Sequence, residues 1–303
     1  MNLPTPLERA PESLAPGRDL WLKREDANEL GAFKWRGALA ALTDFRANGA
    51  RAVVTASTGN HGAATAWAAV RLGLEAFVFV PSAASRAKLA LIERQGAEIR
   101  IAGADMDEAK DSARSFARER GLPFFEDGTE PAQYEGYGRI AEEILDRAGQ
   151  APGAILVPVG NGALIGGIGR ALKRRAPETL LVGVAAKEAP VMVLSFEARR
   201  PVACDRMATF ADGLAVRVAI PCAVEALVEV VDRMLLVAER EIARAVGAYA
   251  AAGIRVEGAA AAALAALPRI EEAPGAAVLI VTGRNIDEEI FRRAREDPES
   301  FPA

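Results

Sequence analysis

The sequence predicts an α/β protein with mostly parallel sheets flanked by helices. Short apolar runs alternate with longer segments of helical period along nearly the whole chain, which is the pattern of strands joined by crossover helices. The 303 residues are 51% hydrophobic, enough for one large core or for two lobes of ordinary domain size. No run of about 18 apolar residues is free of charge or glycine, so we expect no membrane span.

The expected elements follow the chain in order. Strands are predicted where the apolar runs are short, at 51–55, 76–80, 98–101, 153–159, 180–185 and 276–281. Helices are predicted where the apolar period is near 3.6 residues, at 62–72, 86–95, 108–120, 138–148, 165–175 and 239–252. The alanine-rich stretch 258–266 is expected to be a packed helix.

Composition restricts the function classes. A net charge of −4 and a pI near 5.4 give no basic surplus, so nucleic acid is not an expected partner and small molecules are. The two cysteines, Cys204 and Cys222, are too few for a disulfide framework and are expected to be reduced and buried. A single histidine leaves little for a zinc cluster, and we expect no metal site. The first residues show no targeting pattern, so a cytoplasmic location is expected.

Lys34 stands out because lysine is rare in this chain. Of 37 basic residues six are lysine, which leaves 37 − 6 = 31 arginines. A guanidinium keeps its proton, whereas an amine can lose it and condense with an aldehyde. The flanking Phe33 and Trp35 would partly desolvate this amine and favour its uncharged form. The alternative is an ordinary solvated lysine in a loop.

A first loop, 55–62, lies between a predicted strand and a predicted helix and carries the sequence Thr-Ala-Ser-Thr-Gly-Asn-His-Gly. Its small residues expose backbone N–H groups at a helix N-terminus, which suits a carboxylate. His61 is the only histidine of the chain and is open to either a proton-transfer or a packing role. The alternative for the loop as a whole is an ordinary N-cap turn.

A second loop, 157–167, has glycine at 160 and 162 and again precedes a helix. Close backbone approach and the helix dipole favour a phosphate dianion there. A nucleoside-triphosphate loop would need Gly-Lys-Ser/Thr, which is absent. A dinucleotide site remains a distant alternative, because the next strand ends in Ala185 and Ala186 where a ribose-binding acid would be wanted.

A third segment, 278–287, is an apolar strand that runs into a glycine turn through Thr282. A threonine at this place either contacts a ligand or merely caps the next turn.

Taken in this order, the segments resemble the fold type II family of pyridoxal-phosphate enzymes, which includes threonine and serine dehydratases, cysteine synthases and the tryptophan synthase β subunit. The motifs that carry the resemblance are Lys23-Arg-Glu-Asp26, Ala32-Phe-Lys-Trp-Arg-Gly-Ala38, Ser57-Thr-Gly-Asn-His61, Gly160-Asn-Gly-Ala163 and Thr282. The family's serine before Phe33 is Ala32 here, and Asn161 and Ala163 replace glycines of its phosphate loop.

The resemblance implies pyridoxal 5'-phosphate as cofactor and assigns roles to the matching residues. Lys34 would be the catalytic lysine that binds the cofactor as a Schiff base, and Thr282 would face the pyridine nitrogen. The remaining cofactor-binding residues would be Phe33, Asn60, Gly160, Asn161, Gly162, Ala163 and Leu164. The substrate-binding residues would be Ser57, Thr58, Gly59, Asn60 and His61.

The resemblance also implies two lobes, with the active site in the cleft between them. We expect a larger cofactor-binding lobe from 1–40 and 145–303, a smaller α/β lobe at 41–144, and no C-terminal regulatory domain. Family members are commonly dimers, so a homodimer is expected.

The dehydratase branch is favoured by His61 after the asparagine, by Ala211-Asp-Gly213 and by Val256-Glu-Gly-Ala-Ala260. The branch's Gly-Gln-Gly-Thr loop reads Gly136-Tyr-Gly-Arg139 here, which would put an aromatic and a cation near the substrate side chain. Racemase relatives have a serine where Thr58 stands and acidic cation ligands where Ala185 and Val191 align, so racemisation and metal dependence are not expected.

These features predict a lyase that eliminates the β-hydroxyl of an amino acid such as L-threonine or L-serine and yields a 2-oxo acid and ammonia. A neutral hydroxyl at Thr282 would not hold the ring nitrogen protonated, which favours elimination over transamination. Two alternatives stay open: a β-replacement transferase and, with less support, a non-catalytic cofactor-binding subunit.

Overall fold

The computed structural model describes residues 4–270 and 275–303, and it confirms the predicted α/β class. By internal contacts the chain divides into two compact units, one of Met1–Phe33 with Tyr137–Ala303 and one of Lys34–Gly136. The lobe boundaries predicted from the sequence, at 41 and 144, stay a prediction. Each unit contains its own sheet.

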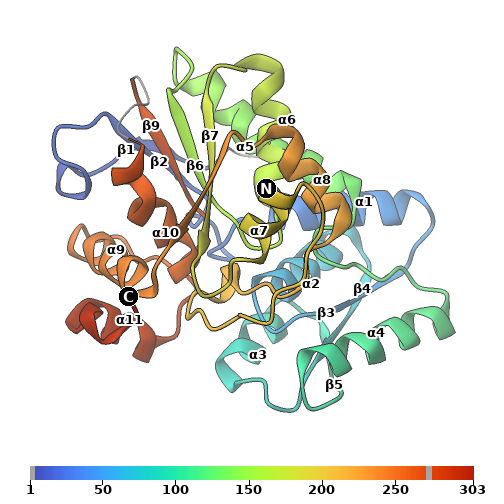
Figure 1. Cartoon of the computed structure of the whole chain (residues 1–303). Helices are drawn as coiled ribbons and strands as arrows, with labels where there is room; N and C mark the ends of the chain where they lie inside the picture. The colour runs from blue at the N-terminus through green and yellow to red at the C-terminus, as the bar shows by residue number, and fades with distance from the viewer. Residues whose placement is uncertain (1–3, 271–274) are drawn as a thin grey trace. The chain divides into compact units, whose positions relative to one another are not determined.

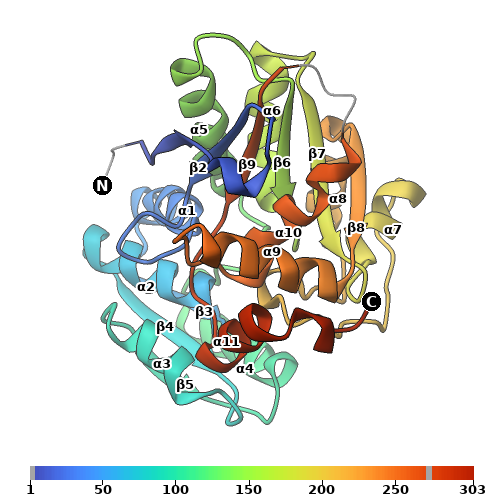
Figure 2. The same ribbon diagram turned by 90° about the vertical axis from the view of Figure 1, so that its left-hand side faces the viewer.

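The first unit is built on a six-stranded sheet in the order β1-β2-β9-β6-β7-β8 (Figure 2). Strand β1 pairs antiparallel with β2, whereas the pairs β2–β9, β9–β6, β6–β7 and β7–β8 are parallel. The strands are β1 (Leu7–Arg9), β2 (Leu20–Arg24), β6 (Ala154–Pro158), β7 (Leu180–Ala186), β8 (Arg233–Val237) and β9 (Ala277–Val281). Because parallel strands end at the same edge, the loops after β6 and β9 leave the sheet on one side.

Helices cover both faces of this sheet. Alternation along β7 sends Val182 and Val184 into the core shared with α9 and α10, whereas Gly183 packs beside Ile165 of α6. Figure 2 shows α9 and α10 on the near face. The helices are α6 (Ala163–Arg175), α7 (Val191–Ala198), α8 (Pro221–Val230), α9 (Glu239–Ala251), α10 (Gly258–Ala266) and α11 (Glu288–Glu296). The 3-10 turns are Glu12–Leu14, Asp212–Leu214, Leu267–Arg269 and Pro298–Ser300.

The second unit has a three-stranded parallel sheet in the order β3-β4-β5, labelled with its helices in Figure 1. Val54 and Phe79 pack against α4 in one apolar cluster. In another cluster Val78 packs with Ala63 of α2 and Ile92 of α3. The elements are α1 (Trp35–Ala47), β3 (Ala52–Ala56), α2 (Asn60–Leu72), β4 (Glu75–Val80), α3 (Arg86–Glu93), β5 (Glu98–Ile101) and α4 (Met106–Arg120). Helix α5 (Pro131–Arg147) runs across the division between the two units.

The structure also corrects the sequence interpretation in places. All six predicted strands exist with ends within a residue or so, but β1, β2 and β8 were missed, as were α1, α7, α8 and α11. Strand β2 carries Lys23 and Arg24, and β8 is mostly half-buried, so neither reads as an apolar run. The predicted helix 138–148 begins instead at Pro131.

The segment Gly136-Tyr-Gly-Arg139, interpreted as a loop, is therefore inside helix α5. Its glycines allow close packing between backbones: a Cβ at Gly136 would lie 2.5 Å from the carbonyl oxygen of Arg36, and one at Gly138 would lie 3.2 Å from that of Gly167. Tyr137 is fully buried, with its ring centroid 5.1 Å from that of Phe33.

The cysteines were predicted to be buried, but Cys204 is half-buried and Cys222 is exposed, because it lies on the outer side of the first turn of α8. Across residues 4–270 and 275–303, none of the helices has the length and apolar character needed to cross a membrane.

Candidate active site

Lys34 lies at the junction between an irregular segment and helix α1. It is the N-cap residue of α1, and its backbone carbonyl accepts from the N–H of Ala38 at 3.1 Å. The preceding residue, Phe33, donates its backbone N–H to the carbonyl of Thr282 at 3.0 Å. The side chain of Lys34 is only 15% exposed. It is therefore a half-buried lysine in a fixed position and not a solvated loop residue.

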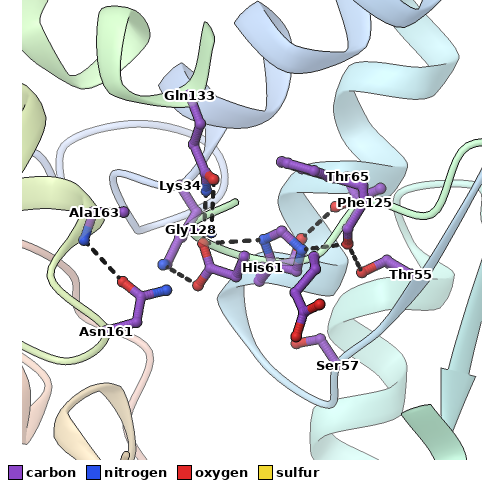
Figure 3. A network of polar contacts seen from close by, with 12 residues as sticks. Lys34, Thr55, Ser57, His61, Thr65, Phe125, Gly128, Gln133, Asn161 and Ala163 are labelled. Atoms are coloured by element: carbon purple, nitrogen blue, oxygen red, sulfur yellow. Dashed lines mark hydrogen bonds and ion pairs between the residues drawn. The ribbon is translucent and has the colours of Figure 1, made fainter. Parts of the chain in front are cut away.

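The ammonium of Lys34 forms an ion pair with the Oδ2 atom of Asp127. The other carboxylate oxygen, Oδ1, accepts from Gln133 at 2.6 Å and lies 3.6 Å from Nδ1 of His61. In Figure 3 the side chains of Lys34, His61 and Gln133 point toward one another. Burial alone would raise the pKa of Asp127, but the charge of Lys34 and the contacts with His61 and Gln133 outweigh it and lower the pKa to about 2. Asp127 is therefore a carboxylate at neutral pH.

His61 is buried in the first turn of α2, with 7% of its surface exposed. Its Nε2 atom lies 3.3 Å from the carbonyl oxygen of Phe125, and its ring centroid is 4.6 Å from that of Phe125. Burial lowers the pKa of His61 below its usual value, against the opposing effect of Asp127. The histidine thus packs in the core and also faces a charged group, and its role in proton transfer stays a prediction.

The loop 57–59 joins β3 to α2 as predicted, and its residues are half-buried. Ser57 donates its backbone N–H to the carbonyl of Phe79 at 3.2 Å, and its Oγ accepts from the N–H of Gly59 at the same distance. Thr58 and Asn60 are also half-buried, and Asn60 begins the helix. The helix dipole at the N-terminus of α2 suits an anion.

The second predicted loop lies at the N-terminus of α6. Gly162 is its N-cap with a φ of 93°, in the left-handed region that favours glycine, and the side chain of Asn161 accepts from the N–H of Ala163 at 3.1 Å (Figure 3). Leu164 is buried in the first turn. A Cβ at Gly160 would lie 2.2 Å from the carbonyl oxygen of Gly213. The loop is therefore a close-packed backbone cradle whose N–H groups and helix dipole suit a phosphate.

Thr282 is buried at the end of β9, with 2% exposed. Its hydroxyl donates to the Oε1 atom of Glu257 at 2.9 Å. Glu257 itself is 7% exposed and precedes α10, and its backbone N–H donates to the carbonyl of Gly283 at 2.9 Å. A Cβ at Gly283 would lie 2.6 Å from a carboxylate oxygen of Glu257, so glycine is needed there for the carboxylate to approach.

The structure thus brings Lys34 and His61 together around Asp127, a residue that the sequence interpretation missed. No local pattern marks Asp127, because its contact with Lys34 joins positions 93 apart in the chain. Glu257 was also missed as a site residue, although its segment was one of the branch signatures. The resemblance of this segment to the dehydratase branch could have suggested Glu257, but only the structure shows its contact with Thr282.

The groups described above suit an organic cofactor. Within residues 4–270 and 275–303 no group of three or more His, Cys, Asp or Glu side chains is placed to hold a metal ion. Ala185 and Val191 are buried apolar residues and supply no carboxylate. Taken singly, a half-buried lysine suits an aldehyde, a backbone cradle at a helix N-terminus suits a phosphate, and a buried hydroxyl suits a ring nitrogen.

Comparison with known proteins agrees with this donor set. Residues 2–283 match the model of a family described as pyridoxal-phosphate dependent enzymes. A curated relative is the L-threonine ammonia-lyase of Geobacter sulfurreducens, which is 35% identical over 275 residues, 89% of this chain and 68% of that protein.

Other relatives are longer or known as structures. The biosynthetic L-threonine dehydratase of Pasteurella multocida is 36% identical over 66% of this chain, but the match spans only 39% of its length. The solved structure of the processed form of threonine deaminase isoform 2 from Solanum lycopersicum superposes with a TM-score of 0.90 at 29% identity. That superposition covers 97% of this chain and 88% of that chain.

Proposed function

Since the chain belongs to the family of pyridoxal-phosphate dependent enzymes, we propose that it is an ammonia-lyase acting on a β-hydroxy amino acid. The substrate class is L-threonine or L-serine, and the products are a 2-oxo acid and ammonia. The observation that carries the proposal is the half-buried Lys34, fixed against Asp127 within the segment Ala32-Phe-Lys-Trp-Arg. The relatives named as threonine ammonia-lyases and dehydratases support the same reaction.

Family membership confirms the predicted cofactor, pyridoxal phosphate, and we propose the following residues to hold it. Lys34 would bind the aldehyde carbon covalently. The cradle of Gly160, Asn161, Gly162, Ala163 and Leu164 would bind the phosphate, and the hydroxyl of Thr282 would contact the ring nitrogen. Phe33 and Asn60 would contact the ring and its substituents. When bound, the cofactor supplies an electron sink that stabilises a carbanion at Cα.

The protein's own groups would carry the proton and orient the substrate. The half-buried loop from Ser57 to Asn60 and the N-terminus of α2 would bind the substrate carboxylate through N–H and hydroxyl groups. Lys34, once its amine is free, would take the proton from Cα onto Nζ. Burial lowers the pKa of His61, so at neutral pH it adds no second cation beside Lys34.

The function is tested by supplying the purified protein with pyridoxal phosphate and L-threonine or L-serine, with and without an added thiol. Formation of 2-oxo acid and ammonia at a rate independent of thiol is the expected result. A thioether product in place of the 2-oxo acid would instead identify a β-replacement enzyme. Binding of the cofactor with no turnover of either amino acid would leave a cofactor-binding subunit. A screen of threo and erythro β-hydroxy amino acids then identifies the preferred side chain.

We also propose a homodimer in the cytoplasm. The dimer is supported by the fact that members of the family are commonly dimers, and the location carries over the expectation from the sequence. Light scattering coupled to size-exclusion chromatography tests the first, since a monomer mass would contradict it. Cell fractionation tests the second.

A further inference from the structure

Asp127 is the charged group in direct contact with the lysine on which the proposed function rests. Its carboxylate forms an ion pair with Nζ of Lys34 and a 2.6 Å hydrogen bond with Nε2 of Gln133, and it lies 3.6 Å from His61. The side chain of Asp127 is 26% exposed and that of Lys34 is 15% exposed. Such a half-buried pair is screened by water much less than a surface pair.

The loop that carries Asp127 is fixed by its neighbours. Gly128 donates its backbone N–H to the side-chain oxygen of Gln133 at 2.7 Å, and the hydroxyl of Tyr134 donates to the carbonyl of Gly128 at 2.8 Å. On the other side of Asp127, Phe125 donates its N–H to the carbonyl of Val54 at 2.7 Å. These bonds hold the carboxylate at one place, so its position does not depend on Lys34 alone.

His61 cannot replace Lys34 as the cation in this cluster at neutral pH. Its Nε2 faces a carbonyl oxygen, which only accepts, so the neutral ring carries its proton on Nε2 and turns a lone pair on Nδ1 toward Asp127. Lys110 also acts electrostatically on His61, but its own ion pair is with Glu126. The ammonium of Lys34 is therefore a positive charge in direct contact with Asp127.

We propose that Asp127 is a positioning residue that holds the protonated amine of Lys34 and so competes with attachment of this lysine to the cofactor. The inference rests on the proposed role of Lys34. To attach, Lys34 must first give its Nζ proton to solvent, after which the nitrogen bonds to the aldehyde carbon and one water leaves. The ion pair stabilises the ammonium form and therefore slows this step.

The same contact helps in turnover. When the substrate amine has displaced Lys34, the free amine takes the proton from Cα and becomes an ammonium again. Asp127 lies where that ammonium is held in the structure, so it stabilises the product of proton removal. Removing the carboxylate should therefore have opposite effects on the two steps, whereas a purely structural defect would slow both.

The test compares wild type with Asp127→Asn and with Glu126→Gln as a matched control. Glu126 is the adjacent carboxylate, but it binds Lys110 and Arg114. The apoprotein is mixed with pyridoxal phosphate, trapped with borohydride at intervals, and the modified Lys34 peptide is measured by mass spectrometry. We expect attachment at pH 7 to be about tenfold faster in Asp127→Asn, the effect of losing one charge-assisted hydrogen bond.

In the same variant kcat for L-threonine should fall by about tenfold or more. Glu126→Gln should match wild type in both readouts. Asp127→Ser, also neutral, gives the same comparison should Asp127→Asn fail to fold. Attachment that is slower or unchanged in the folded variant, or an unchanged kcat, overturns the inference. If wild type itself gives no modified Lys34 peptide, the proposed function fails instead.

Discussion

A carboxylate lies beside each of two side chains that the motifs single out, Asp127 beside Lys34 and Glu257 beside Thr282, but the two pairs differ in charge and exposure. The first is an ion pair whose members are 15% and 26% exposed. The second joins a neutral hydroxyl to a carboxylate, with 2% and 7% of the two residues exposed. The donor of the more buried pair, Thr282, is neutral, whereas the donor of the more exposed pair, Lys34, is charged. The two pairs should therefore respond differently to substitution and to pH.

The difference matters because a hydroxyl has one proton and an ammonium has three. Lys34 can lose one proton and still donate to Asp127, so the pair can survive a change of its chemical state. In the structure Thr282 gives its single proton to Glu257, so donation to a ring nitrogen would require this hydrogen bond to break. The first pair is suited to proton transfer and the second to a fixed orientation.

The largest expected effect comes from removing the cation of the first pair. Lys34→Ala should abolish turnover of L-threonine and the visible absorption band of the bound cofactor, because no other group would form the covalent link. The measurement is an assay for 2-oxo acid together with an absorption spectrum. Lys187→Ala is the control, since Lys187 is an exposed lysine that donates to the carbonyl of Ala303. A Lys34→Ala protein with both activity and band would refute the assignment.

Gly160→Ala tests the close packing of the backbone cradle before helix α6. The added Cβ would lie 2.2 Å from the carbonyl oxygen of Gly213, so backbone must move, and we expect a loss of about 3 kcal/mol in unfolding free energy. Urea unfolding of the apoprotein measures it. Gly247→Ala, in helix α9, is the control. Its Cβ would lie 3.4 Å from the nearest atom, the carbonyl oxygen of Ala294, which is an ordinary van der Waals contact. Equal stability of both variants would contradict the close packing of the cradle.

These two predictions also show how far the sequence could lead. The strands β6, β7 and β9 were predicted because they are buried on both faces and read as continuous apolar runs. Strands β2 and β8 carry charged or half-buried residues, and their place in the sheet comes from pairing with β9 and β7. A pairing between distant segments leaves no local signal.

The same limit applies to the site. Lys34 was found because lysine is rare in this chain and because its motif is a run of neighbouring residues. The comparisons confirm the family that the motifs indicated. The roles given to the individual site residues stay predictions. Asp127 and Glu257 escaped because their importance lies in contacts with residues 93 and 25 positions away, which depend on how helices and loops pack.

Removing the hydroxyl of the buried pair should have a smaller effect than the glycine change. Thr282→Val keeps the shape but leaves Glu257 with one donor fewer in a buried place, so we expect the unfolding free energy to fall by about 2 kcal/mol. Thr282→Ser retains the hydroxyl and should lose less. Urea unfolding of the apoproteins measures both changes. If Thr282→Val and Thr282→Ser are equally stable, the hydrogen bond to Glu257 contributes little.

The smallest expected effect is the pH dependence of the charged pair. The pKa of Asp127 is about 2 in the folded protein against an ordinary value of 3.8. A lowered pKa means that the folded state binds the proton less well than the unfolded state, so this stabilisation is complete above about pH 4 and is lost as the pH falls toward 2. Because water partly screens this pair, we expect its contribution to be about 1 kcal/mol.

Urea unfolding of wild type and Asp127→Asn across this range separates the contribution of Asp127 from general acid effects. The stability gap between the two proteins should be constant near neutral pH and should shrink as the pH falls below about 4. Burial lowers the pKa of His61 from 6.5. This adds a separate loss of unfolding free energy, which begins as the pH falls below 6.5. A gap that stays constant down to pH 3 would show that the Lys34–Asp127 pair contributes no net stability.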